Sequence, residues 1–187
     1  MADLIATTPL AAARGIALDT ETTGLNVKTD RIIEVAAVAF DGDDVDEAGA
    51  YQSLVAAGVP IPAASSKVHG IVDSDLAGAP PFATVHAELM RRLDGHLVIG
   101  HTVGFDMGIL AAECERHKLT WKAPHFLDIR VLAQLAAPNL PGYSLEALAA
   151  WLNVELGERH RATGDAVSSA RVFAALAPKL REAGIRT

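Results

Sequence analysis

The order of apolar segments along the chain constrains its fold more than any other feature. Three apolar runs come first, at residues 15–20, 31–40 and 47–57. The second run is rich in β-branched residues, which favour strands, and the "DGDD" that follows it predicts a hairpin. Two shorter apolar runs, 96–101 and 126–129, come later and alternate with helical segments. Because early hairpins followed by alternating helices and strands build a mixed sheet, we expect an α/β fold.

Four segments have the spacing of apolar residues that is typical of amphipathic helices. They extend over residues 82–95, 105–119, 144–154 and 164–184. Gly95 and Gly184 stop the first and the last of them. The stretch 58–82 contains many prolines and glycines, which predicts mostly loop.

The size and charge of the chain narrow its possible functions. Its 187 residues predict a single domain, and the 23 acids outnumber the 16 lysines and arginines to give a net charge of −7. This charge argues against a wide duplex-binding face, although bound divalent metals still allow a nucleic-acid substrate. The lone Cys114 predicts a reducing cytoplasm without a disulfide framework. The sequence shows neither a signal peptide nor an apolar run long enough to span a membrane.

Two acids end the first predicted strand, within "GIALDTETTGL" at residues 15–25. Asp19 and Glu21 are two residues apart, so an extended backbone points both side chains to one face. Neighbouring carboxylates repel and raise each other's pKa unless a cation lies between them, and Mg²⁺ or Mn²⁺ is the usual cation. The alternative is a strand end that simply carries its acids into solvent.

Three more polar residues stand where chemistry is often found. Asp106 begins a predicted helix, where aspartate is also common as a cap. His160 lies in a polar loop, and Asp165 follows in the first turn of the last predicted helix. Each of these residues alone has an ordinary structural explanation, but their order and context point to a shared site.

Together these motifs resemble the DEDD superfamily of 3′→5′ exonucleases, in the branch with a catalytic histidine typified by the proofreading epsilon subunit of bacterial DNA polymerase III. "DTETTGL" resembles the first motif, "GHTVGFDMGIL" the second and "HRATGD" the third. "DRIIEVAAVAF", "VHGI" and "YSLEALAAWLNV" agree as well. The resemblance extends from about residue 15 to residue 180, and the four acids and the histidine are all present.

The resemblance implies a ribonuclease H-like fold, with a central five-stranded mixed sheet flanked by helices. It also implies hydrolysis with two divalent metal ions, Mg²⁺ or Mn²⁺. Asp19 would bridge both ions, while Glu21 and Asp165 would complete the site of the ion that activates the attacking water. Asp106 would support the second ion. His160 would be the general base, a role that suits the histidine pKa of about 6.5.

The same resemblance implies how the substrate is held. The residues expected to contact the terminal nucleotide are Thr20, Thr22, Gly24, Leu25, His69 and Phe105. Leu25 would lie against the base, and ordinary core packing is the alternative for Leu25 and Phe105. The substrate would be the 3′ end of single-stranded or frayed DNA, or alternatively RNA, and the product would be nucleoside monophosphates.

Three other interpretations of these residues compete with the exonuclease. A phosphatase with an aspartyl nucleophile needs aspartate where Glu21 stands and leaves the third motif unexplained. A non-catalytic binding module would be expected to lack one of the acids. The tyrosine branch of the superfamily needs a tyrosine base, and Tyr143 is too far upstream of Asp165.

The biological setting stays open at this level. Replication proofreading, DNA repair and RNA trimming share this kind of site, and a DNA polymerase or a fused domain is the expected partner. The oligomeric state is undetermined. The chain ends at "REAGIRT" directly after the last predicted helix. We therefore expect residues 1–187 to be one exonuclease domain, with a core at about 15–182, that either stands alone or is excised from a longer chain.

Overall fold

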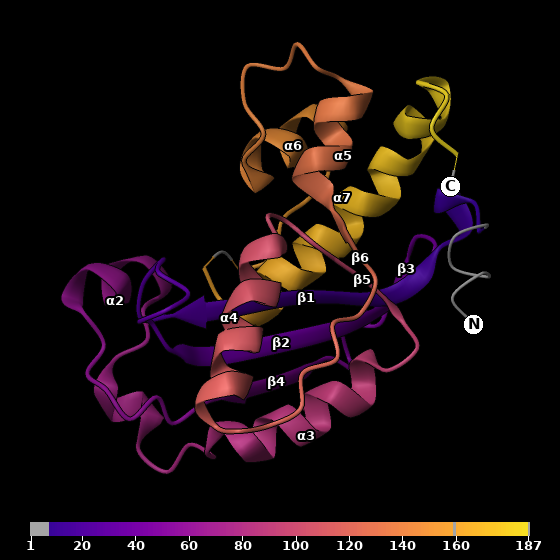
Figure 1. The fold of residues 1–187 in the computed structure, drawn as a ribbon. Coiled ribbons are helices and arrows are strands. Elements are labelled where there is room, and N and C mark those ends of the chain that lie inside the picture. The colour runs from indigo at the N-terminus through magenta and orange to yellow at the C-terminus, as the bar shows by residue number, and fades with distance from the viewer. Residues whose placement is uncertain (1–7, 159, 187) are drawn as a thin grey trace.

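The computed structural model describes residues 8–158 and 160–186, which form one mixed sheet with helices on both faces (Figure 1). The strands within these residues are β1 (Arg14–Thr22), β2 (Ile32–Asp41), β3 (Asp44–Val45), β4 (Tyr51–Leu54), β5 (Leu97–Gly100) and β6 (Phe126–Asp128). Their order is β3-β2-β1-β5-β6, and β4 also pairs with β2. The β1–β5 and β5–β6 pairs are parallel, whereas β2 pairs antiparallel with β1, β3 and β4.

The helices form two layers around this sheet. They are α2 (Ala63–His69), α3 (Phe82–Leu93), α4 (Gly104–Arg116), α5 (Ile129–Ala136), α6 (Leu145–Leu152) and α7 (Ala162–Glu182), with 3₁₀ turns η1 (Leu10–Ala12) and η2 (Asp73–Leu76). Helices α3 and α4 pack on one face of the sheet, while α5, α6 and α7 pack on the other (Figure 1). Among the described helices, none has the length and apolar character needed to cross a membrane.

Side chains of β1 alternate between the two cores, and this alternation decides where its acids point. Ile16 and Leu18 pack in the core beneath α3 and α4. Ala17 packs in the other core, beneath α7. The same alternation, continued along the strand, places Asp19 on the α7 face and Thr20 on the α4 face.

The expected α/β architecture with a mixed sheet is confirmed, with one more strand than the five expected. The extra strand is β3, because the hairpin at "DGDD" continues into two residues that pair with the end of β2. The predicted strand at 47–57 is shorter in the structure, where β4 has only four residues. The four predicted helices are present as α3, α4, α6 and α7.

Two helices of the structure, α2 and α5, were not predicted from the sequence. The expectation that 58–82 is mostly loop is wrong for α2, which Pro62 precedes with φ −60° and Gly70 ends at φ 74°. Proline and glycine therefore delimit a short helix here instead of preventing one. Helix α5 begins at Asp128, whose side chain accepts a hydrogen bond from the backbone N–H of Arg130 at 2.9 Å. No signal in the sequence marks it, because α5 follows β6 directly, with no turn between the strand and the helix.

Helix α7 is the largest contributor to the core on its face of the sheet. Phe173 is 1% exposed and meets Phe40 of β2 edge to face, with ring centroids 5.6 Å apart. We expect Phe173→Ala to lower the free energy of unfolding by about 3–5 kcal/mol, because the truncation loses apolar burial and leaves a cavity. Urea denaturation followed by circular dichroism measures this change.

Leu135 of α5 provides the matched control for that experiment, because it is apolar but 58% exposed. We expect Leu135→Ala to change the free energy of unfolding by no more than about 0.5 kcal/mol. Equal losses in the two variants would show that α7 does not anchor the core.

Candidate active site

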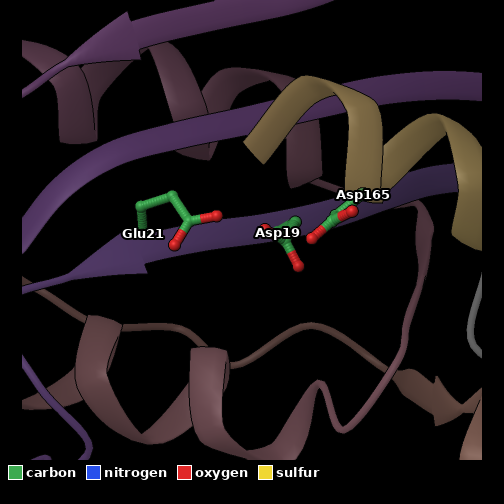
Figure 2. Close-up of side chains that lie close together, drawn as sticks. All are labelled: Asp19, Glu21 and Asp165. Atoms are coloured by element: carbon green, nitrogen blue, oxygen red, sulfur yellow. The ribbon is translucent and has the colours of Figure 1, made fainter. Parts of the chain in front are cut away.

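Three carboxylates meet where β1 passes the first turn of α7 (Figure 2). Oxygen atoms of Asp19, Glu21 and Asp165 all lie within 4.8 Å of one another. Asp165 is buried, and the two strand acids are half-buried. Alternation along β1 turns both strand acids toward α7, and the first turn of the helix brings Asp165 to meet them. The two acids expected on the strand thus lie beside the acid of the third motif.

The donor atoms of this cluster fit a hard divalent cation. All three side chains offer carboxylate oxygens, which Mg²⁺ and Mn²⁺ prefer. Oxygens on opposite sides of a bound Mg²⁺ lie about 4.2 Å apart, given bonds of about 2.1 Å. The 4.8 Å spread of the cluster needs only a small inward movement to reach that spacing. A cation here would also relieve the repulsion among the three charges.

Asp106 lies on the other side of β1 and outside this group of three. It is 5% exposed in the first turn of α4, and it accepts a hydrogen bond from the Thr20 hydroxyl at 2.6 Å. Thr20 points to the α4 face because its neighbours on the strand point to the α7 face. The structure therefore brings three of the four expected acids together and places the fourth across the strand from them.

Burial raises the pKa of Asp106 to about 7. The hydrogen bond from Thr20 acts in the opposite direction, and the nearby charge of Asp128 adds to the increase. Asp128 caps α5 and also accepts a hydrogen bond from the backbone N–H of Thr102 at 3.1 Å. The Asp106 carboxyl therefore keeps its proton to a higher pH than an exposed aspartate does.

His160 lies beside the carboxylate cluster on the loop that precedes α7. Its backbone N–H donates a hydrogen bond to Oδ2 of Asp165 at 3.3 Å, and its side chain is exposed. Its φ of 59° is in the left-handed region, which residues with a side chain seldom adopt. The contacts around the loop must therefore hold His160 in this unfavourable backbone conformation beside the acidic cluster.

The end of β1 and the loop after it hold three of the expected substrate contacts. The Thr22 hydroxyl donates to the carbonyl of Gly24 at 2.7 Å, which closes a tight turn. A Cβ on Gly24 would lie 2.6 Å from an Asp30 oxygen, so a side chain here would have to displace the Asp30 carboxylate. Leu25 at its tip is 87% exposed. Core packing is therefore excluded for Leu25, which stays available to a ligand.

The other expected substrate contacts are more enclosed. His69, at the end of α2, is 5% exposed, and its Nδ1 accepts a hydrogen bond from the backbone N–H of Ile71 at 3.1 Å. Burial lowers the pKa of His69, an effect that the backbone of Thr22 partly offsets. Phe105 is half-buried and packs against the core beneath α3 and α4. The structure thus places His69 beside the loop after β1 and gives Phe105 a core contact.

A buried carboxylate that the sequence analysis did not single out lies next to the cluster. Glu34 of β2 is fully buried, and its backbone is paired with that of Glu21 in the sheet. It forms an ion pair with Arg161, the residue after His160, at 2.6 Å. The available signal was its position as the one acid inside the apolar run "IIEVAAVAF".

Comparisons with known proteins agree with this fold and site. Residues 16–173 match a family model described as exonuclease (RNase_T). A DNA polymerase III subunit epsilon-like protein of Rhodobacter capsulatus is 34% identical over 190 residues, which cover 98% of this chain and 26% of the relative. The DNA polymerase III subunit epsilon of Treponema pallidum is 34% identical over 155 residues, 80% of this chain and 70% of that one.

A solved structure of exonuclease X in complex with 5′ overhanging duplex DNA shares the fold, with a TM-score of 0.69 and 22% identity. The match covers 89% of this chain and 91% of that chain. This likeness confirms the expected ribonuclease H-like architecture.

The extent of the family match shows that this chain belongs to the exonuclease family. The expected exonuclease class is confirmed with it. The chain spans only about a quarter of the length of the relative from Rhodobacter capsulatus.

The raised pKa of Asp106 makes the stability of the protein depend on pH. The carboxyl ionises near its ordinary value of 3.8 when the chain is unfolded and near 7 when it is folded. Between these values the folded state binds more protons, so the free energy of unfolding falls as pH rises. Asp106→Asn does not titrate and keeps an acceptor for Thr20. We expect its stability relative to wild type to increase from about pH 4 to about pH 8.

Urea denaturation at several pH values, in the presence of a metal chelator, measures this difference. The control is Asp43→Asn, in the exposed turn before β3, whose effect on stability we expect to be independent of pH. A constant difference between Asp106→Asn and wild type across the range would contradict the burial argument.

Proposed function

We propose that this chain is the catalytic unit of a divalent-metal-dependent 3′→5′ exonuclease that releases nucleoside monophosphates from the 3′ end of DNA. The observation that carries the proposal is the group of Asp19, Glu21 and Asp165, whose oxygens lie within 4.8 Å of one another. The group is built on a strand and a long helix, which hold catalytic side chains more rigidly than loops do.

The proposed cofactor is a pair of Mg²⁺ or Mn²⁺ ions. Asp19, Glu21 and Asp165 would hold one ion, and Asp106 would support the second together with Asp19. Bound divalent ions supply Lewis-acid stabilisation of the charge that develops on a phosphodiester during hydrolysis. Support for the first ion comes from the donor set and its spacing. The second ion rests on the resemblance.

His160 is the proposed general base. Its exposed side chain can take a proton from the attacking water and pass it to bulk solvent, while water protonates the leaving 3′ oxygen. The hydrogen bond from its backbone N–H to Asp165 keeps the residue beside the carboxylates.

The proposed substrate is a single-stranded or frayed 3′ end, with RNA as the alternative to DNA. Leu25, 87% exposed at the tip of the loop after β1, would lie against the terminal base. Thr20, Thr22, Gly24, His69 and Phe105 would complete the pocket around that nucleotide. The net charge of −7 favours a short contact at a strand end over a long duplex-binding face.

We further propose that residues 1–187 are one exonuclease domain that acts with a DNA polymerase or with a fused domain, in the cytoplasm. The names of the relatives as DNA polymerase III epsilon proteins support the polymerase. The single cysteine, Cys114, is buried and unpaired, which supports a reducing compartment.

Cleavage of matched DNA and RNA oligonucleotides labelled at the 5′ end tests the proposal. We expect a ladder that shortens from the 3′ end with Mg²⁺ or Mn²⁺ and disappears with a chelator. The faster of the two substrates identifies the preferred sugar. Absence of cleavage by folded protein with either metal would favour a binding module instead.

Asp19→Ala is expected to abolish metal-dependent cleavage, because Asp19 is the acid that both proposed metal sites share. The fold should persist, since the side chain is half-buried and removing it relieves repulsion within the cluster. Product formation measures the loss, and circular dichroism checks the fold. Full activity in this variant would rule out the two-metal mechanism.

His160→Ala is expected to reduce kcat by about 10²- to 10⁴-fold, which is the usual contribution of a general base. Binding of the oligonucleotide should change little, because the side chain acts on the water and not on the nucleotide. Steady-state kinetics, with Mn²⁺ affinity as the control, separate the two effects. Turnover at the wild-type rate would remove His160 from the role of base.

A further inference from the structure

The loop that carries His160 is anchored by a buried carboxylate on a neighbouring strand. Glu34 of β2 accepts hydrogen bonds from Nη2 of Arg161 at 2.6 Å and from Nε of Arg161 at 3.2 Å. It also accepts one from the backbone N–H of Ala162, the first residue of α7, at 3.0 Å. One carboxylate thus holds the side chain and the backbone that directly follow His160.

The remaining contacts of Glu34 make this anchor rigid. Its Oε1 also accepts a hydrogen bond from the side chain of Gln52 on β4 at 2.5 Å. Burial raises the pKa of Glu34, but the bonds from Arg161, Ala162 and Gln52 outweigh burial and lower it. The carboxylate is therefore charged and well supplied with donors, which is the condition under which a buried charge is tolerated.

A second set of contacts holds the loop from its other side. The backbone N–H of Gly157 donates to the Ser168 hydroxyl at 3.0 Å, and that hydroxyl donates to the carbonyl of Gly164 at 2.6 Å. A Cβ on Gly164 would lie only 1.8 Å from the carbonyl oxygen of Glu158, so the loop packs directly on the helix. His160, at a φ of 59°, lies between the two anchors.

The charge of Glu34 also acts on the carboxylate cluster. Glu21 and Glu34 are paired residues on β1 and β2, where like charges repel across strands. Arg161 binds Glu34, and its pKa is raised mainly by that hydrogen bond, with Glu21 and Glu158 adding to the increase. The guanidinium thus offsets the repulsion between Glu34 and the metal-binding edge of β1.

We propose that Glu34 is a positioning residue for the reaction, fixing the backbone of His160 beside the three carboxylates through Arg161 and Ala162. The inference rests on the proposed function only in assigning His160 the role of base. The ordering of the loop by Glu34 is a separate claim that does not need the activity.

Glu34→Gln tests the proposal, because it keeps the shape of the side chain and removes the charge that binds Arg161. We expect kcat on a 5′-labelled DNA oligonucleotide to fall about 10- to 100-fold, the usual cost of misplacing a catalytic group by about 1 Å. KM should stay within about 3-fold, since none of the residues proposed to contact the nucleotide is altered. Amide hydrogen exchange across 157–165 should become faster.

Glu113→Gln is the matched control. Glu113 is buried to the same degree, at 1% exposed, and is paired with Arg31 at 2.7 Å, but its other bonds go to Arg116, His117 and the backbone of Ile32. We expect this variant to lose stability while kcat stays within about 3-fold of wild type and exchange across 157–165 is unchanged.

Arg161→Met provides a second route if Glu34→Gln does not fold, because the Arg161 side chain is 35% exposed. It should reproduce the loss of kcat and the faster exchange, and the double variant should be no worse than either single variant, since both break one contact. Unchanged exchange in both single variants, or an equal loss of kcat in Glu113→Gln, would overturn the proposal. If the wild type cleaves no oligonucleotide, the proposed function fails, and exchange still decides whether Glu34 orders the loop.

Discussion

The packing of α7 across β1 and β2 is the contact on which the rest of this structure depends. The helix buries a continuous face from Ala162 to Leu180 against the sheet, with Phe173 against Phe40 near its middle. That burial sets the height of the first turn of the helix above β1. The distance from Asp165 to the strand acids therefore depends on apolar packing around Phe173, about 12 Å along the helix from Asp165.

Two buried glutamates each have a basic partner. Glu34 has Arg161 on the α7 face, and Glu113 has Arg31 on the α4 face. The cluster of three carboxylates differs, because the oxygens of its acids lie within 4.8 Å of one another. A divalent cation bound here would relieve the repulsion among these acids and would thereby stabilise this edge of the sheet.

Several parts of the fold and the site could be predicted from local patterns. The alternation around "LDTET" predicted that Asp19 and Glu21 share a face, and the periodicity after "HRATGD" predicted that Asp165 starts an inward-facing helix. The patterns failed for α2 and α5. Helix α2 has only seven residues between Pro62 and Gly70, in a stretch that prolines and glycines made look like loop, and α5 follows β6 with no turn between them. Glu34 was missed for a related reason, since an acid inside an apolar run has no local pattern that names its partner.

By itself, the sequence predicted the order of most elements, the candidate residues of the site and the fact that the two acids of β1 share one face. These properties depend on backbone geometry and hydrophobic periodicity, which act over a few residues. Only the tertiary structure decided which acids meet. It joined Asp165 to the strand pair, left Asp106 bonded to Thr20 on the opposite face, and tied the segment after His160 to Glu34. Those outcomes depend on how helices pack on the two faces of the sheet, and that packing joins residues more than 80 positions apart along the chain.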